Sequence, residues 1–111
     1  MKFDTKKDGQ NTILILHEKH LNSTMSSELK AEFLLLCKPK VARKIIIDLT
    51  EVQFCDSSGL SALLIAHRAM SEHGGSVHLV HVHKKILDLI KISQLERLFT
   101  INKTVDEAIN S

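Results

Sequence analysis

The chain has 111 residues, of which 43% are hydrophobic and 25% are charged, and its formal net charge is +2. A chain of this length has room for one hydrophobic core and buries about two thirds of its unfolded surface, so it can fold without metal ions or disulfide bonds. The near-neutral charge argues against a dedicated DNA-binding protein, which needs a basic face for the phosphates. With 4 Phe and no Trp or Tyr, the chain also has few rings on which single-stranded bases could stack.

The two cysteines and the N-terminus bear on the cellular compartment. Cys37 and Cys55 lie far apart in the sequence and form no C-x-x-C pair, which favours small, reduced, buried side chains in a cytosolic protein. The N-terminus is charged, and no segment approaches the roughly 20 apolar residues of a membrane span. We therefore expect a cytoplasmic protein that does not insert directly into a membrane.

The first half of the chain predicts a β-hairpin, a helix and a buried strand. Residues 3–6 and 11–18 are the expected hairpin strands on either side of the Asp8-Gly9 turn. After the cap-forming residues 22–24, apolar residues recur at helical spacing until Pro39 ends the helix. Residues 44–50, Lys-Ile-Ile-Ile-Asp-Leu-Thr, are typical of a strand in the interior of a parallel sheet.

The second half of the chain alternates helices with strands. A helix is predicted over 58–73, with Gly74-Gly75 as its stop signal, followed by a strand over 77–82 and a helix over 84–92. A short strand over 98–101 comes next. Residues 104–107, Thr-Val-Asp-Glu, match the capping-box pattern and predict a final short helix.

The order of these elements predicts the fold class. A first hairpin followed by alternating helices and strands indicates an α/β domain, residues 1–111, with a mostly parallel mixed sheet of about four to five strands and about four helices. In open α/β sheets, binding sites collect in the loops that leave the carboxyl ends of the strands. The segment after residues 44–50 is therefore the first place to look for a site.

That segment contains Asp-Ser-Ser-Gly at residues 56–59, at the start of the helix predicted over 58–73. Ser57 or Ser58 can accept hydrogen bonds from the first free N–H groups of the helix. Gly59 lets the backbone bend without a Cβ clash. On these grounds alone, the pattern is that of an ordinary helix N-cap.

Residues 44–69 resemble the signature of STAS domains, specifically of bacterial anti-sigma-factor antagonists. In that family a strand ending in Asp-Leu leads, a few residues later, to Phe-x-Asp-Ser-Ser-Gly-Leu and a helix. Residues 21–24, Leu-Asn-Ser-Thr, are similar to the family's Leu-Asp-x-x-Thr turn, and Gly74-Gly75 and residues 89–99 also follow its pattern. The resemblance covers nearly the whole chain and implies the STAS fold.

The resemblance also implies a function. In such a protein Ser57 is phosphorylated by a partner that is both an anti-sigma factor and a serine kinase. The unphosphorylated domain binds this partner and frees the sigma factor, and the phosphorylated domain releases the partner until a PP2C-type serine phosphatase resets it. Such a domain is a binding module with no catalysis and no cofactor of its own.

Elementary electrostatics is consistent with that switch. A phosphate adds about −1.5 to −2 charges. It would stand next to Asp56, with Glu51 and Asp48 nearby in the sequence. The N-terminus of the following helix favours an anion, so the domain can carry the phosphate. We expect modification to block partner binding without unfolding the domain.

The predicted partner-binding residues surround Ser57. They are Asp56, Ser58, Gly59, Leu60 and Ser61 from the start of the helix, and Asn22 and Thr24 from the neighbouring loop. Asn22 stands where the family usually has Asp, which keeps the cap and removes a charge. Ser93-Gln94 replaces the family's usual Ser-Gly, so the left-handed turn after the third helix must form without glycine.

Other functions fit the sequence less well. A STAS subunit of a lipid-transport complex or of a sensory scaffold, with no phosphorylation, is the main alternative. A small serine hydrolase is disfavoured because the G-x-S-x-G spacing is absent, and no glycine-rich phosphate loop is present either. Among the 7 histidines, His78 is expected on one face of its strand and His81 and His83 on the other, so no metal site is predicted.

Overall fold

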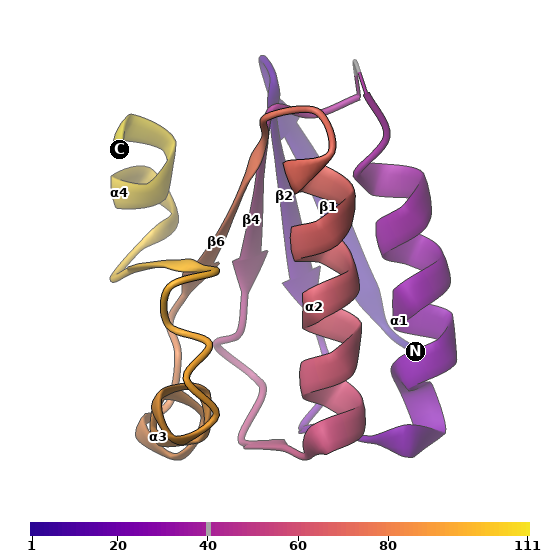
Figure 1. Ribbon diagram of the computed structural model, residues 1–111, viewed down its shortest axis with the longest axis vertical. Coiled ribbons are helices and arrows are strands. Elements are labelled where there is room, and N and C mark those ends of the chain that lie inside the picture. The colour runs from indigo at the N-terminus through magenta and orange to yellow at the C-terminus, as the bar shows by residue number, and fades with distance from the viewer. Residues whose placement is uncertain (40) are drawn as a thin grey trace.

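The computed structural model describes residues 1–39 and 41–111 and contains a five-stranded sheet, a separate two-stranded ribbon and helices on both faces of the sheet (Figure 1). The strands are β1 (Phe3–Asp8), β2 (Asn11–Leu16), β3 (His20–Leu21), β4 (Lys44–Asp48), β5 (Phe54–Cys55), β6 (Ser76–Val80) and β7 (Thr100–Asn102). The helices are α1 (Ser23–Leu36), α2 (Ser57–Ser71), α3 (Lys84–Ile92) and α4 (Val105–Asn110).

The main sheet has the order β1-β2-β4-β6-β7, in which β1 is antiparallel to β2 and every other pair is parallel. The three central strands are rich in Ile, Leu and Val because helices cover both of their faces. This confirms the predicted mixed, mostly parallel α/β architecture. It also places the carboxyl ends of β2, β4 and β6 at one edge of the sheet.

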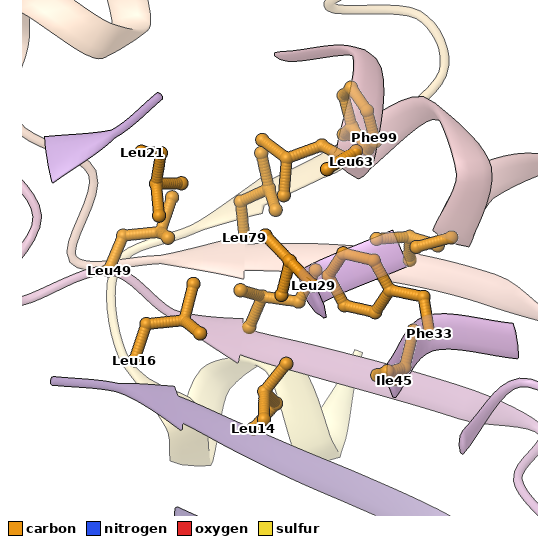
Figure 2. Packing of buried hydrophobic residues seen from close by; sticks show 14 of the residues in the cluster. Leu14, Leu16, Leu21, Leu29, Phe33, Ile45, Leu49, Leu63, Leu79 and Phe99 are labelled. Atoms are coloured by element: carbon orange, nitrogen blue, oxygen red, sulfur yellow. The ribbon is translucent and has the colours of Figure 1, made fainter. Parts of the chain in front are cut away.

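One hydrophobic cluster fills the space between the sheet and helices α1, α2 and α3. Its largest members include Phe33 from α1, Leu63 from α2 and Leu79 from β6, all fully buried (Figure 2). Alternate residues of the same strands point to the opposite face, where Ile46 and Val80 pack with Ala108 of α4. Burial on both faces fixes the register of the central strands, because a slip of one residue would exchange the two cores.

Lys44 attaches α4 to the sheet. Its ammonium donates hydrogen bonds to the carbonyl oxygens of Ala108 at 2.7 Å and of Ile109 at 3.3 Å. A cation near the C-terminal carbonyls is favourable for the helix dipole. The capping residue Thr104, predicted from the sequence, accepts a hydrogen bond from the Glu107 N–H at 3.1 Å.

Several predicted boundaries are wrong by a few residues, for identifiable reasons. The strand predicted over 77–82 ends at Val80 because His81 adopts a left-handed conformation, with φ of 55°. His81 and His83 therefore lie beyond the strand and not on one of its faces. The last strand covers Thr100–Asn102 and not 98–101, because its pairing with β6 begins at Thr100, opposite His78. The left-handed turn without glycine is confirmed at Gln94, with φ of 59°.

Thr12 provides a stability prediction. It lies fully buried in β2, and its hydroxyl has no hydrogen-bond partner among the described residues. We expect Thr12→Val to stabilise the protein by about 1 kcal/mol, because the substitution removes the cost of desolvating an unpaired hydroxyl and keeps the side-chain shape. Urea unfolding measures this change, and Thr100→Val on the exposed face of β7 is the control. A destabilised Thr12→Val protein would contradict the prediction.

Candidate functional site

A short parallel ribbon assembles the candidate site. In it, β3 pairs with β5, so that His20 lies opposite Phe54 and Leu21 opposite Cys55. The backbone N–H of Asp56 continues the ribbon by donating to the Leu21 carbonyl at 3.1 Å. The ribbon therefore joins the loop before α1 to the loop before α2, two segments that are far apart in the sequence.

Asp56 is the N-cap of α2. Its Oδ1 accepts hydrogen bonds from the backbone N–H groups of Ser58 at 2.9 Å and Gly59 at 3.1 Å. The expectation that Ser57 or Ser58 forms this cap is therefore wrong. The helix begins one residue earlier than predicted, and a carboxylate, which also suits the positive end of the helix dipole, takes the capping position.

Ser57 is the first residue of α2 and is exposed. Ser58 and Ser61 of the same helix are half-buried. Leu60 was predicted to border Ser57 on the docking surface, but its side chain is only 7% exposed and belongs to the hydrophobic core. Its contribution to a partner surface is therefore not supported, because the side chains of neighbouring core residues enclose it.

Gly59 is needed for close packing and not for a bend. It lies within the helix and is buried, and a Cβ atom at this position would stand 2.5 Å from the Leu21 carbonyl oxygen and 2.9 Å from the Cys55 sulfur. The first turn of α2 thus rests directly on the backbone of the β3–β5 ribbon. The sequence pointed to the right residue here for the wrong reason.

Asn22 and Thr24 lie at the start of α1. Asn22 is the N-cap, and its Oδ1 accepts a hydrogen bond from the Thr24 N–H at 3.0 Å, so the predicted capping role of Asn22 is confirmed. Helices α1 and α2 lie side by side and begin at the same end of the molecule (Figure 1). The ribbon and the paired helices bring Asn22 and Asp56 to one surface, as the lining of a shared groove also shows.

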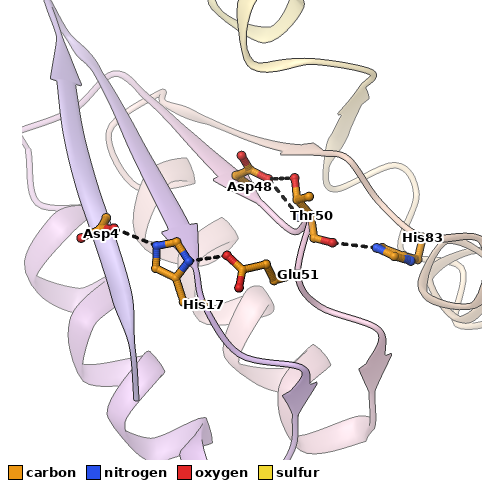
Figure 3. A network of polar contacts seen from close by, with 6 residues as sticks. All are labelled: Asp4, His17, Asp48, Thr50, Glu51 and His83. Atoms are coloured by element: carbon orange, nitrogen blue, oxygen red, sulfur yellow. Dashed lines mark hydrogen bonds and ion pairs between the residues drawn. The ribbon is translucent and has the colours of Figure 1, made fainter.

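A polar network holds the loop between β4 and β5, and this loop leads through β5 to the candidate site (Figure 3). Asp48 accepts a hydrogen bond from the Thr50 N–H at 2.9 Å, and the Thr50 carbonyl lies 2.8 Å from Nε2 of His83.

His17, which follows β2, lies between two carboxylates. It contacts Asp4 of β1 at 2.7 Å and is hydrogen-bonded to Glu51 through its other ring nitrogen. Glu51 and Asp48 therefore serve to fix this loop.

The His17 cluster predicts a pH-dependent stability. Hydrogen bonds to Glu51 and then to Asp4 raise the pKa of His17 above its ordinary value of 6.5. Because the folded-state pKa is the higher one, the stabilisation is present below about pH 6.5 and is lost as the pH rises through the folded-state value. We expect the stability difference between wild type and His17→Gln to be larger near pH 6 than at about pH 8.5 in urea unfolding.

The control for this prediction is His67→Gln, which lies in α2 and has an edge-on contact with Phe99. Its stability difference from wild type should not follow the pH dependence seen for His17→Gln. A difference between wild type and His17→Gln that stays constant over the same pH range would contradict an ionic role for His17.

The two cysteines and His78 lie in buried or half-buried surroundings. Burial raises the pKa of Cys37 to about 12 and that of Cys55 to about 11, so both thiols stay protonated at neutral pH. His78 is buried, lies between Asn102 and Ser76, and burial lowers its pKa. Over residues 1–39 and 41–111, no group of three or more metal-ligating side chains is placed to hold an ion.

No helix in the described part of the chain combines the length and the apolar character needed to cross a membrane. The longest one, α2, has 15 residues and packs against the sheet.

Comparison with solved structures supports the fold. SpoIIAA of Bacillus, described as an anti-sigma factor antagonist, is 19% identical in its unphosphorylated form, with a TM-score of 0.82 over 98% of this chain and 94% of that one. An anti-sigma-factor antagonist (STAS) domain protein from Planctomyces limnophilus is 21% identical, with a TM-score of 0.87 over 97% and 94% of the two chains.

The same fold occurs within a much larger protein. The murine anion transporter Slc26a9 is 15% identical, with a TM-score of 0.81 over 95% of this chain and 18% of the transporter chain. The family model for the STAS domain matches residues 3–108. Because this match covers almost the whole length and agrees with the observed topology, the chain belongs to the STAS domain family.

Proposed function

We propose that this protein is an anti-sigma-factor antagonist whose binding is switched by phosphorylation of Ser57. The unphosphorylated domain binds an anti-sigma factor with serine kinase activity and thereby frees a sigma factor. Phosphorylation by that kinase releases the domain, and a PP2C-type phosphatase restores it. The domain itself has no catalytic activity in this scheme and acts as a binding module.

The position of Ser57 is the observation that carries the proposal. Its side chain is exposed at the first residue of α2, so a kinase can reach its hydroxyl without unfolding the domain. Asp56 holds the preceding backbone by accepting two hydrogen bonds from the helix. The start of α1, with Asn22 and the exposed Thr24, lies at the same end of the molecule and extends the surface available to a partner.

The same geometry gives the phosphate its effect. The sequence predicts that the helix N-terminus favours the phosphate, but the Asp56 carboxylate already accepts hydrogen bonds from the N–H groups of Ser58 and Gly59, which an anion would otherwise take. A phosphate of about −1.5 to −2 charges on Ser57 therefore stands beside a carboxylate at the surface. The added negative charge and the bulk of the phosphate lie at the surface where a partner would dock. The hydrophobic core below this surface is unchanged.

A STAS subunit of a transport complex is the second candidate, because the same fold forms part of the anion transporter Slc26a9. In that role Ser57 need not be phosphorylated. The modification state of Ser57 therefore separates the two functions.

The test is phosphorylation of the full chain by a candidate kinase. Incubation with ATP and the serine-kinase anti-sigma factors encoded in the same genome should add one phosphoryl group of about 80 Da to the peptide that contains Ser57. The transfer should be absent in Ser57→Ala and retained in Ser58→Ala. Ser57→Asp should keep the wild-type circular dichroism spectrum and bind the kinase at least about tenfold more weakly.

Two results would contradict the switch. One is a kinase that binds the chain tightly and transfers no phosphate to Ser57. The other is a folded Ser57→Asp protein that binds this kinase as well as wild type does. Either result, together with co-purification of the chain with transporter subunits, would favour the transport role.

A further inference from the structure

A groove lies between the β3–β5 ribbon and α3, beside the Ser57 site. Its volume is about 430 Å³, and Asp56 forms part of its lining. Leu21 and Ile86 are buried, Leu89 is half-buried, and together they give the groove an apolar floor. The groove is therefore suited to an apolar side chain from another molecule.

Phe54 forms the exposed wall of this groove. It is 42% exposed and is one of four exposed large hydrophobic residues in the described part of the chain, with Leu34, Leu35 and Ile92. The His20 ring stacks on it with centroids 4.9 Å apart, and the Lys85 ammonium lies 5.3 Å from the ring centroid. A second hollow of about 370 Å³ borders the same Phe54 and Lys85, together with Lys84 and other polar side chains.

The side chains around the groove include two lysines, and helix stability does not explain their positions. Lys84 and Lys85 occupy the first turn of α3, where the helix dipole disfavours cations, and no acidic residue stands in that turn. The N-cap His83 makes no side-chain capping hydrogen bond. Neither lysine forms an ion pair with another described residue. These cations are thus available to a partner.

The acidic side chains nearby do not neutralise the groove. Asp56 is the only carboxylate that lines either hollow, and Lys84 and Lys85 outnumber it. Asp88, on the following turn of α3, lines neither hollow. The rim therefore presents an exposed aromatic ring and two lysines above an apolar floor.

We propose that this groove docks an acidic segment of a partner protein, with an apolar side chain of that segment seated on the floor and its carboxylates paired with Lys84 and Lys85. Charge complementarity selects the segment, and the apolar contact supplies much of the binding energy. A nucleobase is a poorer fit, since Phe54 is already stacked on His20. The groove shares Asn22 and Asp56 with the Ser57 site, whereas Lys84 and Lys85 lie outside that site. Variants of the two lysines therefore test the docking surface separately from the Ser57 switch.

The test uses the full chain and a synthetic peptide of about twelve residues that has two central leucines flanked by glutamates. In an NMR titration we expect saturable binding with a Kd below about 1 mM, with the largest amide shifts at Phe54, Lys85 and Leu89. A matched peptide with glutamine in place of glutamate should bind at least about tenfold more weakly, and added salt should weaken the binding of the acidic peptide.

Variants separate docking from stability. The double variant Lys84→Glu, Lys85→Glu should lose at least about tenfold in peptide affinity, although acids in the first turn favour the helix and should keep or raise the melting temperature. Phe54→Ser should also weaken binding. Lys91→Glu, in the last turn of the same helix, is the matched control and should leave peptide affinity unchanged.

The proposal is overturned if no saturable binding occurs up to about 1 mM, if the glutamine peptide binds equally well, or if the shifts lie away from the groove. A single-stranded oligonucleotide that binds the groove more tightly than the acidic peptide would also overturn it. Ser57→Ala should bind the peptide like wild type. Failure of the docking proposal is therefore distinguishable from failure of the phosphorylation proposal.

Discussion

Gly59→Ala is expected to destabilise the protein by about 2 kcal/mol, although alanine is the better helix former. The added methyl group would stand 2.5 Å from the Leu21 carbonyl oxygen and 2.7 Å from the Leu21 Cβ. The carbonyl is part of the ribbon backbone and accepts the hydrogen bond from the Asp56 N–H, so it cannot move without breaking that bond. The gain in helix propensity offsets only part of this cost.

Urea unfolding at constant m-value measures the loss in Gly59→Ala, and hydrogen exchange at the Asp56 amide reports whether the ribbon has separated from α2. Ser61→Ala, at a half-buried position two residues further along the helix, is the control and should change stability by less than about 0.5 kcal/mol. A Gly59→Ala protein as stable as wild type would show that the ribbon and α2 can separate at no cost.

Asp56→Ala should destabilise the protein by about 1 to 2 kcal/mol, because two backbone N–H groups at the start of α2 lose their acceptor. The first turn of α2, which carries Ser57, should fray. We expect faster amide exchange at Ser58 and Gly59 and weaker recognition of Ser57 by a kinase. Chemical unfolding and hydrogen exchange on the same samples test both effects.

Asp56→Asn distinguishes capping from charge. Asparagine caps helices about as well as aspartate, so this variant should recover most of the stability that Asp56→Ala loses, and it removes the charge beside Ser57. Asp88→Ala, at an exposed position in α3, is the control. Equal stability of Asp56→Ala and wild type would contradict the capping role.

The long elements of this fold were predictable because their patterns are strong. The helix over Lys84–Ile92 was placed correctly, and the strand of 44–50 is the buried central strand of the sheet. The ribbon was missed because β3 and β5 have two residues each. A pattern of alternation needs about four residues to be recognised, and such short strands depend on tertiary contacts and not on local preference.

The chemical details of the site were harder to predict than its place. The sequence Asp-Ser-Ser at the start of a helix offers three side chains that can cap it, and only the backbone geometry selects Asp56. Leu60 follows the motif directly, yet helical rotation turns it into the core. Phe54 belongs to the family motif, but its exposure had no signal in the sequence, because an aromatic residue in a predicted loop between a strand and a helix is ordinarily buried.

The β3–β5 ribbon also relates the site to the folding of the whole chain. Its two strands are distant in sequence, so pairing them closes a loop that contains helix α1 and strand β4, and closing such a loop costs conformational entropy. A partly folded chain can contain α2 and its serines without the surface that joins them to the start of α1. A partner that contacts both loops therefore recognises the completed native state and discriminates against nascent or locally opened molecules.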